Sequence, residues 1–262
     1  MIVFSAFVPH PPIAIPEVGK ENLDKLSDTI KAYQTLEHEI YSAKPDTIIL
    51  ISSHAEQREE AFAVNQAPDF KVNFKKFGDL VTNLQFKNDI GFGYQIKELC
   101  EDYFPVMMTA QEELDYGSGV PLFYLTQHLP NIKVVSIAYS NLSSEDHFKF
   151  GQIIRKQINL AGKRVAVIAS GDLSHKLHKD SPAGYSARGQ EFDQKIIKAL
   201  AEKKVDDVIH LDPELVKEAG ECGHRALLVL LGVIDELNYE HRQLSYQSPF
   251  GIGYLVTNFE IK

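Results

Sequence analysis

Thr47–Ser52 runs TIILIS and Arg164–Ala169 runs RVAVIA, and these two stretches decide the fold class of the 262-residue chain. A strand with one face in water alternates apolar and polar residues, whereas a strand covered on both faces is apolar almost throughout. Both stretches therefore predict strands in the interior of a largely parallel sheet.

Working outward from them, short β-branched runs alternate with segments of helical periodicity along the whole chain. Further strands are predicted at Ile2–Val8 and Lys133–Tyr139, weaker ones at Glu60–Asn65 and Phe70–Phe74, and a closing hairpin from Gln243–Ser248 with Gly253–Glu260. Helices are predicted at Glu21–Ser42, Tyr94–Tyr103, Gly119–His128, Glu145–Leu160, Arg188–Glu202 and Glu221–Leu237. This alternation predicts one α/β domain over residues 1–262, with a central, mostly parallel or mixed sheet and helices on both faces.

Composition narrows the class of partner. The chain has 27 Lys and Arg against 36 Asp and Glu, a net charge of -9, which argues against nucleic acid as a ligand. No stretch approaches the roughly 18–20 apolar residues that cross a bilayer, and the N-terminus lacks the basic start of a signal peptide. With two cysteines, we expect a cytoplasmic protein with reduced thiols and a small organic ligand. A homo-oligomer is compatible with this composition.

Each of three predicted strands is followed by a histidine. His10 stands in Val-Pro-His-Pro-Pro after the first strand, His54 follows TIILIS, and His175 ends Ser-Gly-Asp-Leu-Ser-His after RVAVIA. Ligands of open α/β sheets gather where loops leave the carboxyl ends of strands. The prolines around His10 also make a stiff turn, and ligation rewards a preorganised imidazole. We therefore expect the three imidazoles at one rim, with a metal ion on His10 and His54.

The segment Gly220–His224 (GECGH) offers a carboxylate and a thiol as a third ligand. Two histidines with Glu221 would form the facial triad typical of non-haem ferrous iron, whereas Cys222 in its place would favour zinc or copper. Glu221 can equally be an acidic residue stabilised near a helix N-terminus. His175, neutral near pH 7, suits acid–base work. A serine hydrolase is disfavoured because no Gly-x-Ser-x-Gly turn is present.

Five motifs in order resemble a known family. These are Val8–Pro12, Ser53-His54, Asp115–Leu122 (DYGSGVPL), Ser170–His175 and Ala219–Arg225 (AGECGHR). Together they are similar to the catalytic, subunit-B-type chain of the class III extradiol ring-cleaving dioxygenases, a superfamily that also includes the Memo family. The resemblance extends from His10 to the final hairpin.

The resemblance implies Fe(II) on His10 and His54, with His175 as the catalytic histidine. The third ligand falls in Glu221-Cys222, where we prefer Glu221 and keep Cys222 as the alternative, the latter with Zn or Cu. Ring-cleaving members often have a histidine where this chain has Tyr116, and a phenol with a pKa near 10 is a poor base at neutral pH.

The implied function is cleavage of a catechol-type ring with O2, with Tyr116 assisting His175. The alternative is a Memo-like metal-binding protein without ring cleavage. A third hypothesis is an α/β binding module whose histidines only bond loop carbonyls.

Overall fold

The computed structural model describes residues 1–55 and 59–262. Its strands are β1 Ile2–Val8, β2 Thr47–Ser52, β3 Phe62–Asn65, β4 Asp69–Asn73, β5 Asn83–Asn88, β6 Val106–Thr109, β7 Lys133–Ala138, β8 Val165–Ser170, β9 Tyr239–Gln247 and β10 Tyr254–Ile261. Its α-helices are α1 Pro16–Gly19, α2 Ser27–Ala43, α3 Ile90–Glu101, α4 Tyr116–Leu125, α5 Ser144–Leu160, α6 Ala187–Ala201, α7 Val205–Ile209, α8 Pro213–Ala219 and α9 His224–Ile234.

One mixed sheet runs through the molecule in the order β4-β5-β7-β2-β8-β1-β10-β9, with β3 and β6 attached beside β7. The central strands β7, β2, β8 and β1 are parallel to one another, and β10 and β9 close the far edge as an antiparallel pair. Every residue of β2 and of β8 is buried. The predicted fold class, with its apolar central strands, is therefore confirmed.

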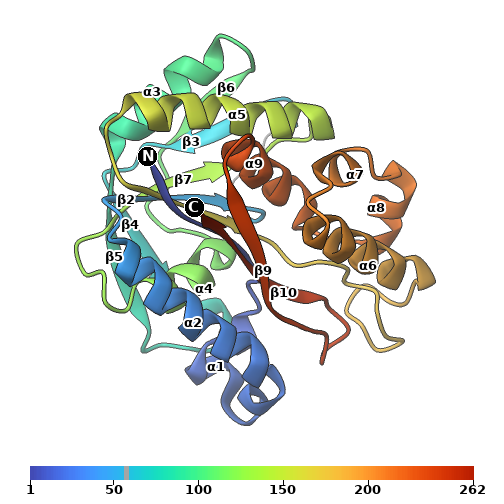
Figure 1. The fold of residues 1–262 in the computed structure, drawn as a ribbon. Helices are drawn as coiled ribbons and strands as arrows, with labels where there is room; N and C mark the ends of the chain where they lie inside the picture. Colours follow the sequence, from blue (N-terminus) through green and yellow to red (C-terminus); the bar gives the residue numbers. More distant parts are fainter. Residues whose placement is uncertain (56–58) are drawn as a thin grey trace.

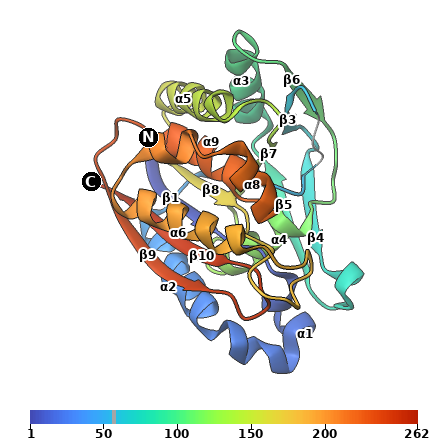
Figure 2. The same cartoon turned by 90° about the vertical axis from the view of Figure 1, so that its right-hand side faces the viewer.

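Helices cover both faces of this sheet (Figure 1). On one face α3, α5, α6 and α9 enclose one apolar cluster with the sheet, and on the other α2 and α4 enclose a second. Figure 2 shows α5 and α9 packed above the sheet, with α1 and α2 below it. Because both faces are covered, the strand ends are the places where polar side chains can meet a ligand.

Several predicted boundaries were wrong for local reasons. The helix expected from Glu21 begins as a 3-10 segment at Lys20–Leu26, and α2 starts only at Ser27. The helix expected at Gly119–His128 begins at Tyr116, because Asp115 caps it by accepting a hydrogen bond from the Ser118 N–H. Strands β5 and β6 and helices α1, α7 and α8 were not predicted.

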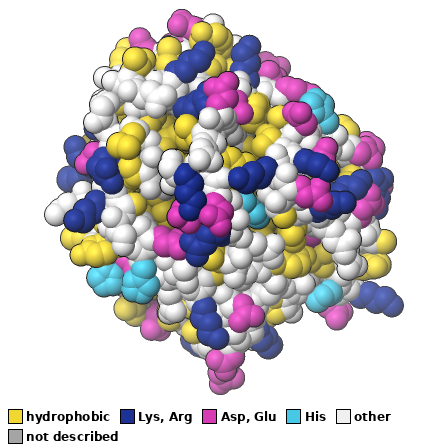
Figure 3. All heavy atoms as spheres, in the orientation of Figure 1, with side chains coloured by type: hydrophobic (Ala, Val, Ile, Leu, Met, Phe, Trp, Pro, Cys, Tyr) yellow, Lys and Arg dark blue, Asp and Glu magenta, His cyan; other side chains and the backbone are white. Residues whose placement is uncertain are grey.

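The surface carries charges of both signs. On the face in Figure 3, Lys and Arg side chains lie among Asp and Glu side chains. Within the described residues, no helix is long and apolar enough to cross a membrane.

Candidate metal centre

The centre is built where three neighbouring parallel strands end. Strand β8 lies between β1 and β2, and its last residue, Ser170, is in register with Val8 of β1 and Ser52 of β2. Two residues beyond these three positions come His10, His54 and Asp172. The equal offset places the three side chains at one level of the sheet edge, as expected for the two histidines.

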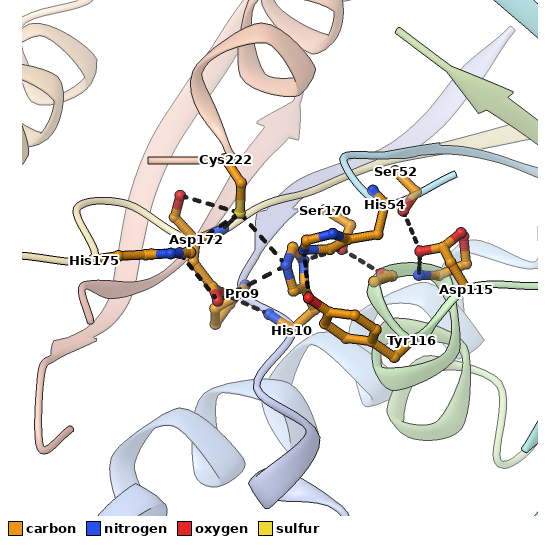
Figure 4. Close-up of polar contacts among 12 residues, drawn as sticks. Pro9, His10, Ser52, His54, Asp115, Tyr116, Ser170, Asp172, His175 and Cys222 are labelled. Atoms are coloured by element: carbon orange, nitrogen blue, oxygen red, sulfur yellow. Dashed lines mark hydrogen bonds and ion pairs between the residues drawn. The ribbon is translucent and has the colours of Figure 1, made fainter. Parts of the chain in front are cut away.

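His10, His54 and Cys222 form a compact group (Figure 4). Each offers a ligand atom within 4.8 Å of the others, and the rings of the two histidines are 4.8 Å apart, edge to face. Cys222 Sγ lies 3.5 Å from His10 Nε2. A tetrahedral ion with sulfur at about 2.3 Å and nitrogen at about 2.0–2.1 Å separates the two ligand atoms by roughly 3.5 Å. The donor set therefore fits a divalent transition metal.

A relay of hydrogen bonds fixes the tautomer of His10. The Ser170 hydroxyl donates its single hydrogen to the Gly117 carbonyl at 2.5 Å, so its oxygen must accept from His10 Nδ1–H at 2.9 Å. Gly117 can receive that hydrogen because Pro121, four residues later inside α4, has no N–H to donate to it. The Nε2 lone pair of His10 is thereby left for the Cys222 side of the site, as a metal ligand requires.

His54 is held by the beginning of α4. Its backbone N–H donates to Ser52 Oγ at 3.2 Å, and Ser52 Oγ donates to Asp115 Oδ1 at 2.6 Å. The Tyr116 hydroxyl lies 2.8 Å from His54 Nε2. Tyr116 therefore lies in direct contact with a candidate ligand.

Asp172 and His175 form a second group around the same thiol. His175 Nε2 lies 3.8 Å from Cys222 Sγ and 3.9 Å from Asp172 Oδ2. Asp172 Oδ1 accepts the His10 backbone N–H at 2.9 Å, and the Asp172 N–H donates to Cys222 Sγ at 3.3 Å. His175 is 25% exposed at its side chain, so it can reach a molecule bound at the centre.

Glu221, the preferred third ligand, does not join these groups. Its Oε2 accepts the His224 backbone N–H at 2.5 Å, which is the helix-capping role considered as the alternative. The side chain also lines a different cavity, on the α8 side of the segment. Within the described residues, Cys222 takes the place near the histidines. Consecutive side chains diverge at this turn, so a one-residue adjustment cannot exchange them.

Two glycines let the Cys222 segment approach β8. A Cβ on Gly171 would lie 2.2 Å from the Gly223 Cα, and one on Gly223 would lie 2.9 Å from the Asp172 carbonyl oxygen. At this contact the Cys222 N–H donates to the Asp172 carbonyl at 3.3 Å. Glycine at both positions is therefore what brings the thiol to the strand ends.

Burial sets the protonation states before an ion binds. It lowers the pKa of His10 to about 3 and that of His54 to about 4, and it lowers the pKa of His175. All three imidazoles are thus neutral near pH 7. Burial also raises the pKa of the Cys222 thiol well above its usual value. Binding of a cation would remove that thiol proton.

Three roles in the site were not predicted, although the sequence suggested Asp172 as a hydrogen-bond partner of His175. They are Asp172 as a partner of both His10 and Cys222, Ser170 as the acceptor for His10, and Asp115 as the anchor of Ser52. The register of the strand ends could have indicated Ser170 and Asp172. Asp115 lies outside that register, as the N-cap of α4.

Comparison with known proteins identifies the family. A family model described as the catalytic LigB subunit of aromatic ring-opening dioxygenase matches residues 5–257. The chain belongs to this family. The membership confirms the resemblance found in the motifs.

Relatives of this LigB-family chain include a protein of Clostridium acetobutylicum, 32% identical over 97% of the chain. The chain spans 56% of that relative's length. The 3,4-dihydroxyphenylacetate 2,3-dioxygenase of Escherichia coli is 24% identical over 95% of this chain and 96% of its own length. A crystal structure of an uncharacterized protein from Escherichia coli K12 has a TM-score of 0.70 at 16% identity, covering 98% of this chain and 99% of the other. That likeness supports the fold.

Proposed function

We propose that the chain is a metal-dependent dioxygenase that opens a small aromatic ring bearing adjacent hydroxyl groups, with O2 as co-substrate. The observation that carries this proposal is the meeting of His10, His54, Cys222 and His175 at one sheet edge. Family membership, and relatives named as dioxygenases, support it.

In this proposal His10, His54 and Cys222 hold the ion. A bound divalent ion would supply Lewis acidity and a common binding place for the diol oxygens and O2. Ferrous iron is the ion that the family resemblance implies, whereas a thiolate in place of the carboxylate equally suits zinc or copper.

His175 is the proposed acid–base group. Its ring is neutral near pH 7 because burial lowers its pKa, so Nε2 can accept a proton from a substrate hydroxyl and return it to the leaving oxygen. Tyr116 cannot share the role of base, since burial raises its pKa further above the usual value. Its hydroxyl can hydrogen-bond a substrate oxygen beside His54.

A second candidate is a metal-binding protein that does not cleave rings. Two residues favour this second candidate. Cys222 offers a thiol where iron dioxygenases use a carboxylate, and Tyr116 stands where they often have histidine.

Anaerobic reconstitution with Fe(II), Zn(II) or Cu(I), followed by O2 uptake on a panel of catechols, separates the two functions. Uptake with a matching ring-opened product, abolished in a His10→Ala, His54→Ala double variant, supports the dioxygenase. Stoichiometric metal binding without uptake for any catechol supports the second candidate. In that case Tyr116→His, which restores the family pattern, tests whether the phenol alone limits activity.

A further inference from the structure

A cavity lies beside the Glu221-Cys222 turn, with Glu221 in its lining and the candidate ligand Cys222 outside the lining. It has a volume of about 740 Å³, within the range of small-molecule sites. Its walls come from the N-terminal end of α5, from α7 and α8, and from the beginning of α9. Figure 1 shows these ends close together at one side of the molecule.

One wall of the cavity is apolar. It is formed by half-buried or buried aliphatic side chains, among them Leu142, Ile209, Leu211 and Val216. Aliphatic groups lining an open cavity favour a ligand with an apolar body, because the contact removes their surface from water.

The cavity lining carries charges of both signs, with Glu145 and Glu221 against Lys217 and Arg225. His210, also in the lining, lies 3.8 Å from Glu145. The Glu221 carboxyl accepts the His224 backbone N–H and has no Lys or Arg nitrogen of the described chain within ion-pair distance. Burial raises its pKa to about 7, and the charge of Arg225 works against that rise. Arg225 donates to the amide oxygen of Asn141 at 2.9 Å rather than to a carboxylate. Lys217, also in the lining, makes no ion pair with a described residue. Two carboxylates and two cations thus share the lining, and Glu221, Lys217 and Arg225 form no ion pair with one another.

We propose that this cavity binds a small zwitterion with an apolar side chain, an amino acid or a short peptide. Its ammonium group pairs with Glu221, its carboxylate with Arg225 and Lys217, and its side chain packs on the aliphatic wall. A ligand that carries only one charge would lack one of these two sets of pairings, and charge-assisted hydrogen bonds are the strong ones. The occupant would contact Glu221, the residue next to Cys222 in the chain.

Isothermal titration calorimetry of the full, metal-loaded chain tests this proposal. The probes are L-leucine, L-phenylalanine and Leu-Leu, with two analogues of leucine: 4-methylpentanoate, which lacks the amine, and 3-methylbutylamine, which lacks the carboxylate. At least one zwitterion should bind saturably at one per chain, and both single-charge analogues of leucine should bind about tenfold or more weakly than leucine. Tighter binding of leucine or phenylalanine identifies a free amino acid as the ligand, and tighter binding of Leu-Leu identifies a peptide.

Variants keep the test specific to this cavity. Glu221→Gln retains an acceptor for the His224 N–H, so the fold and the metal content should persist while zwitterion binding falls about tenfold or more. Val216→Trp fills the cavity and should abolish binding of every probe. Glu214→Gln, a change of an exposed carboxylate of α8 outside the lining, should have no effect. The proposal is overturned if no zwitterion binds at millimolar concentration, or if either Glu221→Gln or Val216→Trp binds like the unchanged protein.

Discussion

Ser170→Ala tests the hydrogen-bond relay that orients His10. The change leaves His10 Nδ1–H and the Gly117 carbonyl, both at buried residues, without the hydroxyl that joins them. Loss of an outer-shell partner of a metal histidine costs about 10–100-fold in metal affinity. Each buried polar group left unpaired costs about 1–3 kcal/mol of folding free energy. We therefore expect weaker metal binding and a less stable apo-protein.

Competition with a chromophoric chelator measures the metal affinity, and urea unfolding of the apo-protein measures the stability. Ser5→Ala is the matched control, because Ser5 is a buried serine of β1 whose hydroxyl donates to the Phe259 carbonyl at 2.8 Å and does not contact His10. Ser5→Ala should lose stability but keep the metal affinity. If Ser170→Ala binds metal as tightly as Ser5→Ala, the relay does not orient the ligand.

Three further predictions concern the thiol, the acid–base group and the glycine contact. The raised pKa keeps Cys222 protonated near pH 7, while His10 and His54 are already neutral. Metal binding should therefore release about one proton, and metal affinity should rise about tenfold per pH unit between pH 6 and 8. Calorimetry in two buffers of different ionisation enthalpy measures the number of protons released, and a value of zero would contradict this prediction. His175→Ala should bind metal normally but slow turnover of a proven substrate by about 10²–10⁴-fold, and loss of the metal would make His175 a ligand instead. Gly171→Ala should lower the stability of the apo-protein by about 1–3 kcal/mol and also lower its metal affinity, because the new Cβ would lie 2.2 Å from the Gly223 backbone. If urea unfolding and chelator titration show unchanged stability and unchanged metal affinity, the contact is not needed.

The central strands could be predicted from sequence because their environment is uniform. Strands β2 and β8 are covered on both faces, so nearly every residue in them is apolar. Strand β5 was not predicted although the burial of NLQFKN alternates, because only Leu84 and Phe86 of its six residues are apolar and so short a pattern is a weak signal. Helices α7 and α8 have 5 and 7 residues, which is too short for helical periodicity to appear.

The part of the candidate site that follows from the order of strands and loops along the chain could be predicted. His10 and His54 follow parallel strands, so the fold class places them on one edge of the sheet, and the order β2-β8-β1 then brings them close. The choice between Glu221 and Cys222 depended on which way two consecutive side chains point at a turn. That direction is set by the backbone contact of Gly171 with Gly223, a tertiary feature that spacing in the sequence does not encode.

Metal content of two neighbouring variants tests the central claim most directly, namely that His10, His54 and Cys222 hold one ion. Structural zinc sites with four ligands bind with about 10–16 kcal/mol in total, so one ligand corresponds to about 3 kcal/mol, or roughly a hundredfold in affinity. Cys222→Ser should therefore lose stoichiometric metal in chelator competition, whereas Glu221→Gln should keep it. Retention of metal by Cys222→Ser together with its loss from Glu221→Gln would contradict the assignment.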